Sequence, residues 1–199
     1  MDVKSLNKRE GSYTIKSNFM ERKIINPVIK DTITFVQTSE ESNGRVTELE
    51  LTLMPNGNNF PHYHKTLTET FKAIEGPLGL KLKGDKIKIL QPSETYTVPV
   101  NEVHSFFNPG NTEIRFNALL TPGHQGFENS LRILYGLAED GLTNKRSVPK
   151  SLQHIAVIGS ISDSHISGFM KILIPLFNFL AKRAKTNGLE KRLIEKYCN

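Results

Sequence analysis

The chain has 199 residues, of which 37% are hydrophobic and 23% are charged, a balance that is ordinary for a folded globular protein. Its single cysteine, Cys198, excludes an intramolecular disulfide and argues against a small secreted domain held together by disulfides. The net charge of +6 lies at the two ends, with +4 over residues 1–30, −3 over 31–170 and +5 over 171–199, so the basic balance does not predict a nucleic-acid groove.

The first 30 residues are predicted to form a polar N-terminal arm with one strand. No apolar run follows the charges of the first ten residues, so this segment does not resemble a secretory signal. No uninterrupted apolar segment approaches the ~20 residues that span a bilayer. We therefore expect a cytoplasmic protein.

Residues 31–122 are predicted to form one antiparallel β-domain. Residues 32–38 are rich in β-branched and aromatic side chains, Asn43-Gly44 is a strong hairpin signal, and leucines alternate with polar residues over 47–54. Further strands are predicted at 69–75, 78–82, 87–90, 95–98 and 114–120. Many short strands, with no helix until about residue 126, indicate a closed or sandwiched sheet.

A group of metal-ligating residue types lies within this domain. His62 and His64 are two residues apart, so in an extended strand both imidazoles point to the same face. A turn over residues 65–68 can return Glu69 to that face, and a second stretch supplies His104 as the fourth candidate ligand. Three imidazoles and one carboxylate suit a divalent transition metal, whether Fe, Mn, Ni, Cu or Zn.

The two stretches resemble the two sequence motifs of the cupin superfamily. The first motif, G-x5-H-x-H-x3,4-E-x6-G, is matched by His62, His64, Glu69 and Gly76, with Gly57 one residue nearer than the pattern asks. The second motif, G-x5-P-x-G-x2-H-x3-N, is matched by Pro99, His104 and Asn108, with Ser93 and Asn101 where the motif has glycine. Asparagine tolerates the left-handed backbone that such a position can require.

This resemblance covers about residues 30–122 and carries several expectations. It implies a mainly β fold, a double-stranded β-helix (jelly-roll) barrel, with the four ligands holding one metal ion. It also implies a homodimer that associates through edge strands. The alternative is a barrel whose site is vestigial and whose polar cluster is satisfied by water.

A substrate pocket is predicted from the side chains that share the inward strand faces. Its lining would be Phe71, Ala73, Phe106, Asn108 and Phe116, with Phe60 and Tyr63 near the mouth. This aromatic, uncharged lining favours a small apolar or aromatic molecule over a phosphorylated sugar. If Glu69 detached from the metal, it could also serve as a catalytic base.

Residues 123–199 are predicted to form a helical extension that packs on the barrel or at a dimer interface. Helices are expected at 126–138, 151–161 and 189–197, and an apolar helical stripe runs from Phe169 to Leu180. Pro175 marks either a kink or the first turn of a second helix in that stripe. A barrel followed by a helix with Gly-Leu-Ala-Glu-Asp-Gly at 136–141 is similar to a group of bacterial cupin-domain proteins.

Three remaining histidines lie outside the two motifs and are expected in loops or helices: His124, His154 and His165. No G-x-S-x-G, P-loop or Rossmann motif occurs, so nucleophilic and nucleotide chemistries have no support.

Three functions remain open. The first is a metal-dependent enzyme, with dioxygenase-like oxygenase or isomerase activity toward a small organic molecule. The second is a non-catalytic binding or sensor module that carries a metal. The third is a membrane-peripheral role through residues 169–185, where basic side chains follow the apolar stripe.

Overall fold

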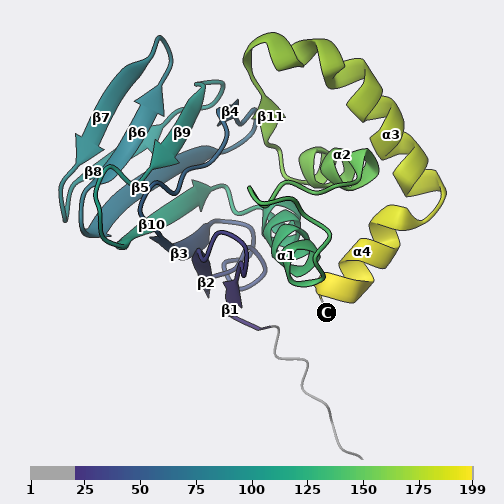
Figure 1. The fold of residues 1–199 in the computed structure, drawn as a ribbon, viewed down its shortest axis with the longest axis horizontal. Helices are drawn as coiled ribbons and strands as arrows, with labels where there is room; N and C mark the ends of the chain where they lie inside the picture. The colour runs from purple at the N-terminus through teal and green to yellow at the C-terminus, as the bar shows by residue number, and fades with distance from the viewer. Residues whose placement is uncertain (1–20, 199) are drawn as a thin grey trace, which may run out of the picture.

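Two antiparallel β-sheets and a C-terminal group of helices make up residues 21–198, the part of the chain that the computed structural model describes (Figure 1). The prediction for residues 1–20 lies outside the described residues, as do the side chains of residues 169–171.

Each sheet draws strands from distant parts of the sequence. The six-stranded sheet has the order β1 (Lys23–Ile25), β2 (Thr32–Gln37), β3 (Thr47–Leu53), β10 (Ile114–Thr121), β5 (Thr68–Glu75), β8 (Thr95–Val98). The five-stranded sheet has the order β11 (His165–Ile166), β4 (His62–Tyr63), β9 (His104–Phe107), β6 (Leu78–Leu82), β7 (Lys86–Leu90). From β3 to β10 the chain passes repeatedly between the two sheets, which is the double-stranded β-helix arrangement. The predicted mainly β fold with C-terminal helices is confirmed.

The core of the β-domain lies between the facing sheets. Period-two alternation places Phe71 and Ala73 of β5 and Phe116 of β10 on the inner face, and all three are fully buried. The Phe116 ring lies 6.2 Å from that of Phe71 and 5.2 Å from that of Phe106, measured between centroids. This packed aromatic group fills the interior next to the candidate metal ligands.

The first helix, α1 (Gln125–Glu139), covers the part of the inner face that the five-stranded sheet leaves open. Its partly buried residues Phe127, Leu131 and Leu134 pack against buried side chains of β2 and β3, including Phe35 and Leu49. The helical spacing predicted over 126–138 therefore marks the face that meets the sheet.

A buried carboxylate fastens α1 to the turn between β2 and β3. The Glu128 carboxylate is 1% exposed and accepts hydrogen bonds from the Ser39 backbone N–H and the Thr47 hydroxyl, each at 2.6 Å. His124 caps the helix, because its Nδ1 accepts the Phe127 N–H at 2.9 Å.

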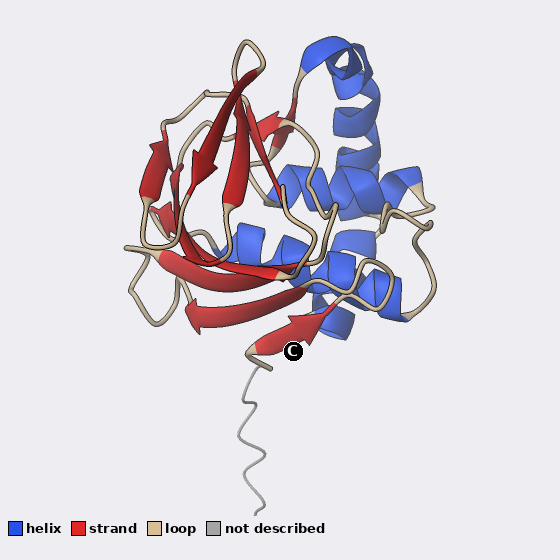
Figure 2. Cartoon of the chain, turned by 60° about the vertical axis from the view of Figure 1, so that its left-hand side comes forward, coloured by secondary structure: helices blue, strands red, loops and turns tan. Residues whose placement is uncertain are grey.

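The rest of the chain forms a helical layer beside the sheets (Figure 2). It contains α2 (Leu152–Ile161), the 3-10 helix η1 (Gly168–Leu173), α3 (Ile174–Thr186) and α4 (Leu189–Tyr197). The predicted helices at 151–161 and 189–197 are confirmed. Pro175 lies in the first turn of α3, which resolves the open alternative in favour of a new helix rather than a kink.

One strand within this region departs from the prediction. His165, expected in a loop or helix, lies in β11, which pairs antiparallel with β4. Two residues are too few to leave a period-two pattern in the sequence, so only the neighbouring edge of β4 defines this strand.

Asp31, just before β2, provides a pH-dependent test of the fold. Burial raises the pKa of this carboxyl to about 6, and the Met54 N–H donates to it at 3.4 Å. The folded state thus binds this proton more tightly than the unfolded state, so stability falls as pH rises from about 4 to about 6 and stays reduced above that. We expect Asp31→Asn to raise the free energy of unfolding by about 2 kcal/mol at pH 7 and by much less at pH 4. Urea unfolding at both pH values measures this, and an equal gain at both would contradict it.

Candidate metal centre

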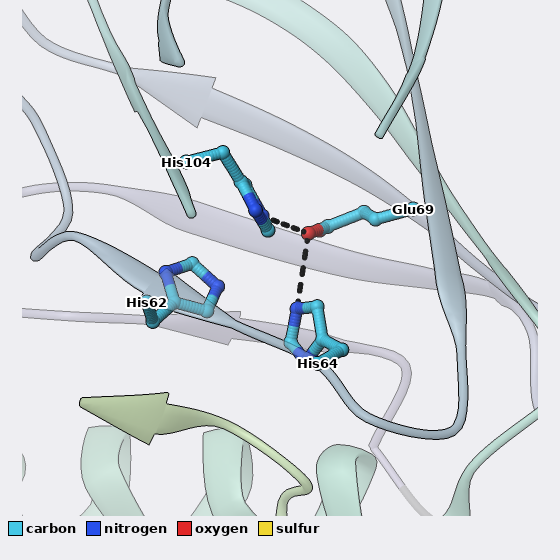
Figure 3. A group of neighbouring side chains, drawn as sticks. All are labelled: His62, His64, Glu69 and His104. Carbon is cyan, nitrogen blue, oxygen red and sulfur yellow. Dashed lines mark hydrogen bonds and ion pairs between the residues drawn. The ribbon is translucent and has the colours of Figure 1, made fainter. Parts of the chain in front are cut away.

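The four predicted ligands come together where the two sheets meet (Figure 3). His62 belongs to β4 and lies directly opposite His104 of β9, while Glu69 reaches the same point from β5 in the other sheet. His64 follows β4 at once. One ligand atom from each of the four side chains lies within 4.8 Å of the others. This convergence is the structural basis of the candidate centre.

The Glu69 carboxylate is the hub of the group. Its Oε2 lies 3.0 Å from His104 Nε2 and 3.4 Å from His64 Nε2. Glu69, His64 and His104 are each at most 4% exposed, whereas His62 is partly exposed. His62 therefore marks the side on which the centre is most accessible.

Each histidine is oriented by a backbone carbonyl that contacts Nδ1. A proton on Nδ1 donated to such a carbonyl leaves the Nε2 lone pair available to a cation, and histidines that bind metals are commonly oriented in this way. The three contacts are His62 with Phe60 O at 2.9 Å, His64 with Asp163 O at 3.1 Å and His104 with Glu102 O at 3.1 Å.

The electrostatics of the group favour a cation at its centre. Although His62 as a residue is partly exposed, its imidazole lies against the other three side chains, and burial of this ring together with the neighbouring His104 lowers its pKa to about 4. Burial would raise the pKa of Glu69, but the Nε2 contacts of His104 and His64, where a proton takes the place that a cation would occupy, outweigh it and hold that pKa well below its usual range. Burial also disfavours charged His104, yet its hydrogen bond to Glu69 raises the pKa of that imidazole.

The donor set fits a divalent transition metal. His64 and His104 direct Nε2 toward the same carboxylate oxygen, while carbonyls take up their Nδ1 atoms. A divalent cation would satisfy the ionised carboxylate and the imidazole lone pairs at once. Mixed nitrogen and oxygen ligation suits several first-row metals and does not choose among them.

Two of the motif departures occupy left-handed backbone. Ser93 has φ +77° and Asn101 has φ +64°, at the two positions where the second cupin motif has glycine. Asn101 is the milder case because asparagine visits this region more readily than serine. The sequence departs from the motif here while the backbone keeps a conformation that favours glycine.

Asp163 contacts the candidate centre and was not predicted from the sequence. Besides the carbonyl that orients His64, its Oδ2 accepts the Lys65 N–H at 3.0 Å, the Thr66 N–H at 2.8 Å and the Thr66 hydroxyl at 2.7 Å. It thus fixes both the ring of His64 and the turn that follows it. The only sequence signal was a short polar segment after an apolar helix, which does not name a partner 98 residues away.

We expect Asp163→Ala to weaken metal binding by about tenfold, because without the carboxylate the turn at Lys65 and Thr66 and the Asp163 carbonyl that orients His64 are no longer held in place. Competition against a fluorescent zinc chelator measures this. Asp85→Ala is the matched control because Asp85, an exposed turn residue, shares the positive φ of Asp163, +57° against +52°. Equal affinities of the two variants would contradict a role for the Asp163 carboxylate.

The residues predicted to line a substrate pocket occupy different surroundings. Phe71, Ala73 and Phe116 belong to the buried core, whereas Phe60 is 64% exposed. The Tyr63 ring stacks on His165, with centroids 5.3 Å apart. Their assignment to a pocket stays a prediction.

Asn108, also predicted to line the pocket, makes three hydrogen bonds at a turn. Its Nδ2 donates to Leu53 O at 2.9 Å and to Thr112 O at 2.7 Å, and its Oδ1 accepts the Gly110 N–H at 2.8 Å. These bonds tie the turn after β9 to the end of β3.

Comparison with known proteins finds similarity among solved structures. The polyketide cyclase RemF from Streptomyces resistomycificus is 24% identical with a TM-score of 0.42, over 46% of this chain and 64% of that one. A cupin-superfamily sugar phosphate isomerase from Silicibacter pomeroyi is 18% identical with a TM-score of 0.41, over 46% and 59%. A predicted oxalate decarboxylase from Thermotoga maritima is 20% identical with a TM-score of 0.45, over 52% and 91%.

The matched regions thus span less than two thirds of the cyclase and of the isomerase. No protein-family model and no curated protein sequence matches the chain. The solved structures that resemble it include cupin-superfamily proteins, as its motifs predicted.

Proposed function

We propose that this cupin-type chain is a metal-dependent enzyme that acts on a small organic molecule, by oxygenase or isomerase chemistry, at the group His62, His64, Glu69 and His104. The observation that carries the proposal is the convergence of four ligand atoms within 4.8 Å from two different sheets. A divalent transition metal bound there would supply Lewis-acid polarisation or activation of oxygen.

The surrounding residues would exclude water from the reacting groups. Between ring centroids, Phe71 lies 6.0 Å from His104 and Phe127 lies 5.9 Å from His64, and both pairs are edge-on. Substrate would therefore approach on the His62 side, near the exposed Phe60. An apolar wall on the buried side strengthens electrostatic interactions within the site.

Glu69 is the candidate base in this proposal. Its carboxylate is held ionised by the two imidazoles, so it can accept a proton only when it is released from the cation and from His64 and His104. A suitable substrate for such a base is a molecule with a C–H group next to a carbonyl, because that carbon can lose a proton.

The test is a screen of small carbonyl compounds and aromatic compounds with the metal-loaded protein. Consumption of a compound, lost in His62→Ala/His104→Ala, is the expected result. Turnover that survives both substitutions would overturn the proposal. A compound that raises the melting temperature without being consumed would instead support a binding or sensor module.

A second candidate function rests on α3. One side of α3 packs on α2 through the buried Ala184, whereas Ile172, in the preceding 3-10 helix, and Phe179 are 82% and 60% exposed. Basic Lys182, Arg183 and Lys185 follow. An exposed apolar surface beside basic side chains favours contact with an anionic membrane surface. Among residues 21–198, no helix has the length and apolarity needed to cross a bilayer.

Sedimentation with phosphatidylserine-containing vesicles at low salt tests this candidate. We expect Ile172→Ser/Phe179→Ser to reduce the pelleted fraction severalfold, because each substitution removes exposed apolar surface from the contact. Ile87→Ser, at a 62% exposed isoleucine on β7, is the control. Failure of the wild-type chain to pellet with the vesicles would exclude membrane binding through this surface. If a second copy of the chain covers the surface instead, light scattering will show a dimer.

A further inference from the structure

A cavity of about 500 Å³ lies outside the metal centre, between the edge of the five-stranded sheet and the helical layer. Its walls come from β4, from residues 163–166 and from α2 and α3, which lie beside one another in both views (Figures 1 and 2). Small-molecule sites typically have volumes of about 300–1,000 Å³. The cavity is therefore large enough for a small organic ligand.

This cavity is distinct from the candidate metal centre. Tyr63 lies between His62 and His64 in sequence, so its side chain points to the opposite face of β4. That face bears the cavity, where Tyr63 stacks on His165. None of the four metal ligands is among the residues that line it.

The helix side of the cavity is apolar. Ile155 of α2 and Phe177 and Ala181 of α3 contribute to this wall. Gly159 of α2 also lines it, and a Cβ added at Gly159 would have no heavy atom within 4 Å. A glycine in a helix interior costs roughly 0.5–1 kcal/mol relative to alanine, and here it leaves open space for an occupant.

The strand side of the cavity is polar and cationic. Its one carboxylate, Asp163, already accepts three hydrogen bonds from Lys65 and Thr66 and pairs with His165 Nε2 at 3.0 Å. Lys65, an exposed residue with a cationic side chain, also lines this wall. An anionic group at this end would lie near the cationic Lys65, and the one carboxylate there, Asp163, already has hydrogen-bond donors of its own.

We propose that this cavity binds an aliphatic monocarboxylate, with the hydrocarbon chain between α2 and α3 and the carboxylate at Lys65. The apolar wall from the helices and the cationic wall from the strand loop match the two ends of such a molecule. The hydrogen bonds of Asp163 fix the polar wall before the ligand arrives, which limits the entropy lost on binding.

Isothermal titration of the full chain with sodium octanoate tests the proposal. We expect Gly159→Leu to weaken octanoate binding by tenfold or more, because the new side chain fills the cavity. Lys65→Gln should weaken it by about tenfold, the effect of one charge-assisted hydrogen bond. Gln153→Leu places the same leucine elsewhere on α2 and should leave binding unchanged. Leucine has a higher helix propensity than glycine, so we expect Gly159→Leu to remain folded, and thermal unfolding checks this.

Two further comparisons separate this site from the metal centre and from general hydrophobic binding. The His62→Ala/His104→Ala variant should bind octanoate as the wild type does, whatever its enzymatic activity. Octylammonium should bind at least tenfold more weakly than octanoate. Absence of octanoate binding to the wild type, equal binding by Gly159→Leu, or equal binding of the two probes would overturn the proposal.

Discussion

We expect the wild-type chain to purify with about one divalent transition-metal ion per molecule and the His62→Ala/His104→Ala variant to purify with almost none. Both substitutions remove imidazoles whose Nδ1 atoms contact the backbone carbonyl two residues earlier in the chain. The remaining His64 and Glu69 offer two ligands, which is too few for tight binding. Elemental analysis of untagged protein, purified without added metal or chelator, measures this difference.

His154→Gln is the matched control for this loss. His154 lies in α2 and belongs to no group of metal-ligating side chains within the described residues. The control should keep the wild-type metal content. Added metal should raise the melting temperature of the wild type and of the control but not of the double variant. Full metal content in the double variant would contradict the assignment of His62 and His104 as metal ligands.

The second large effect is expected at Phe71, which packs beside the centre without binding the metal. Phe71→Ala should lower the free energy of unfolding by about 3–5 kcal/mol, because truncation of a fully buried phenylalanine leaves a cavity. Its ring contacts those of Phe106 and Phe116 and that of His104. Chemical denaturation at pH 7 measures the change.

Phe60→Ala is the comparison, because Phe60 is 64% exposed and its truncation should cost no more than about 0.5 kcal/mol. Metal content should persist in folded Phe71→Ala, since no ligand is removed. A loss below about 1 kcal/mol would mean that the interior around Phe71 is not close-packed.

Much of the β-domain could be predicted because its strands carry short-range patterns. Leu49 and Leu53 alternate with polar residues, and Asn43-Gly44 adopts the left-handed backbone that a hairpin turn uses, with φ +54° and +76°. The spacing of His62 and His64 placed both on one strand face. His104 required the motif resemblance, because its position opposite His62 depends on strand pairing.

In the helical region, sequence periodicity predicted less well which side chains are covered. The stripe predicted from Phe169 to Leu180 assumed one apolar face, yet Phe177 lines the cavity beside α2 while Leu176 is 45% exposed. The stripe also spans two helices, a 3-10 helix that ends at Leu173 and α3 that begins at Ile174, so its side chains do not follow one helical period. Helical spacing alone could not register that change.

The sequence by itself indicated His62, His64 and Glu69 as candidate ligands, because alternation and turn preferences act over a few neighbouring residues, and the motif resemblance added His104. Only the tertiary structure decided that Asp163 holds His64 and that β11, α2 and α3 enclose a second cavity. Those contacts join segments about 100 residues apart, and their formation depends on how the helical layer packs against the edge of β4. Local sequence patterns cannot predict that packing, because they relate only residues that are close in sequence.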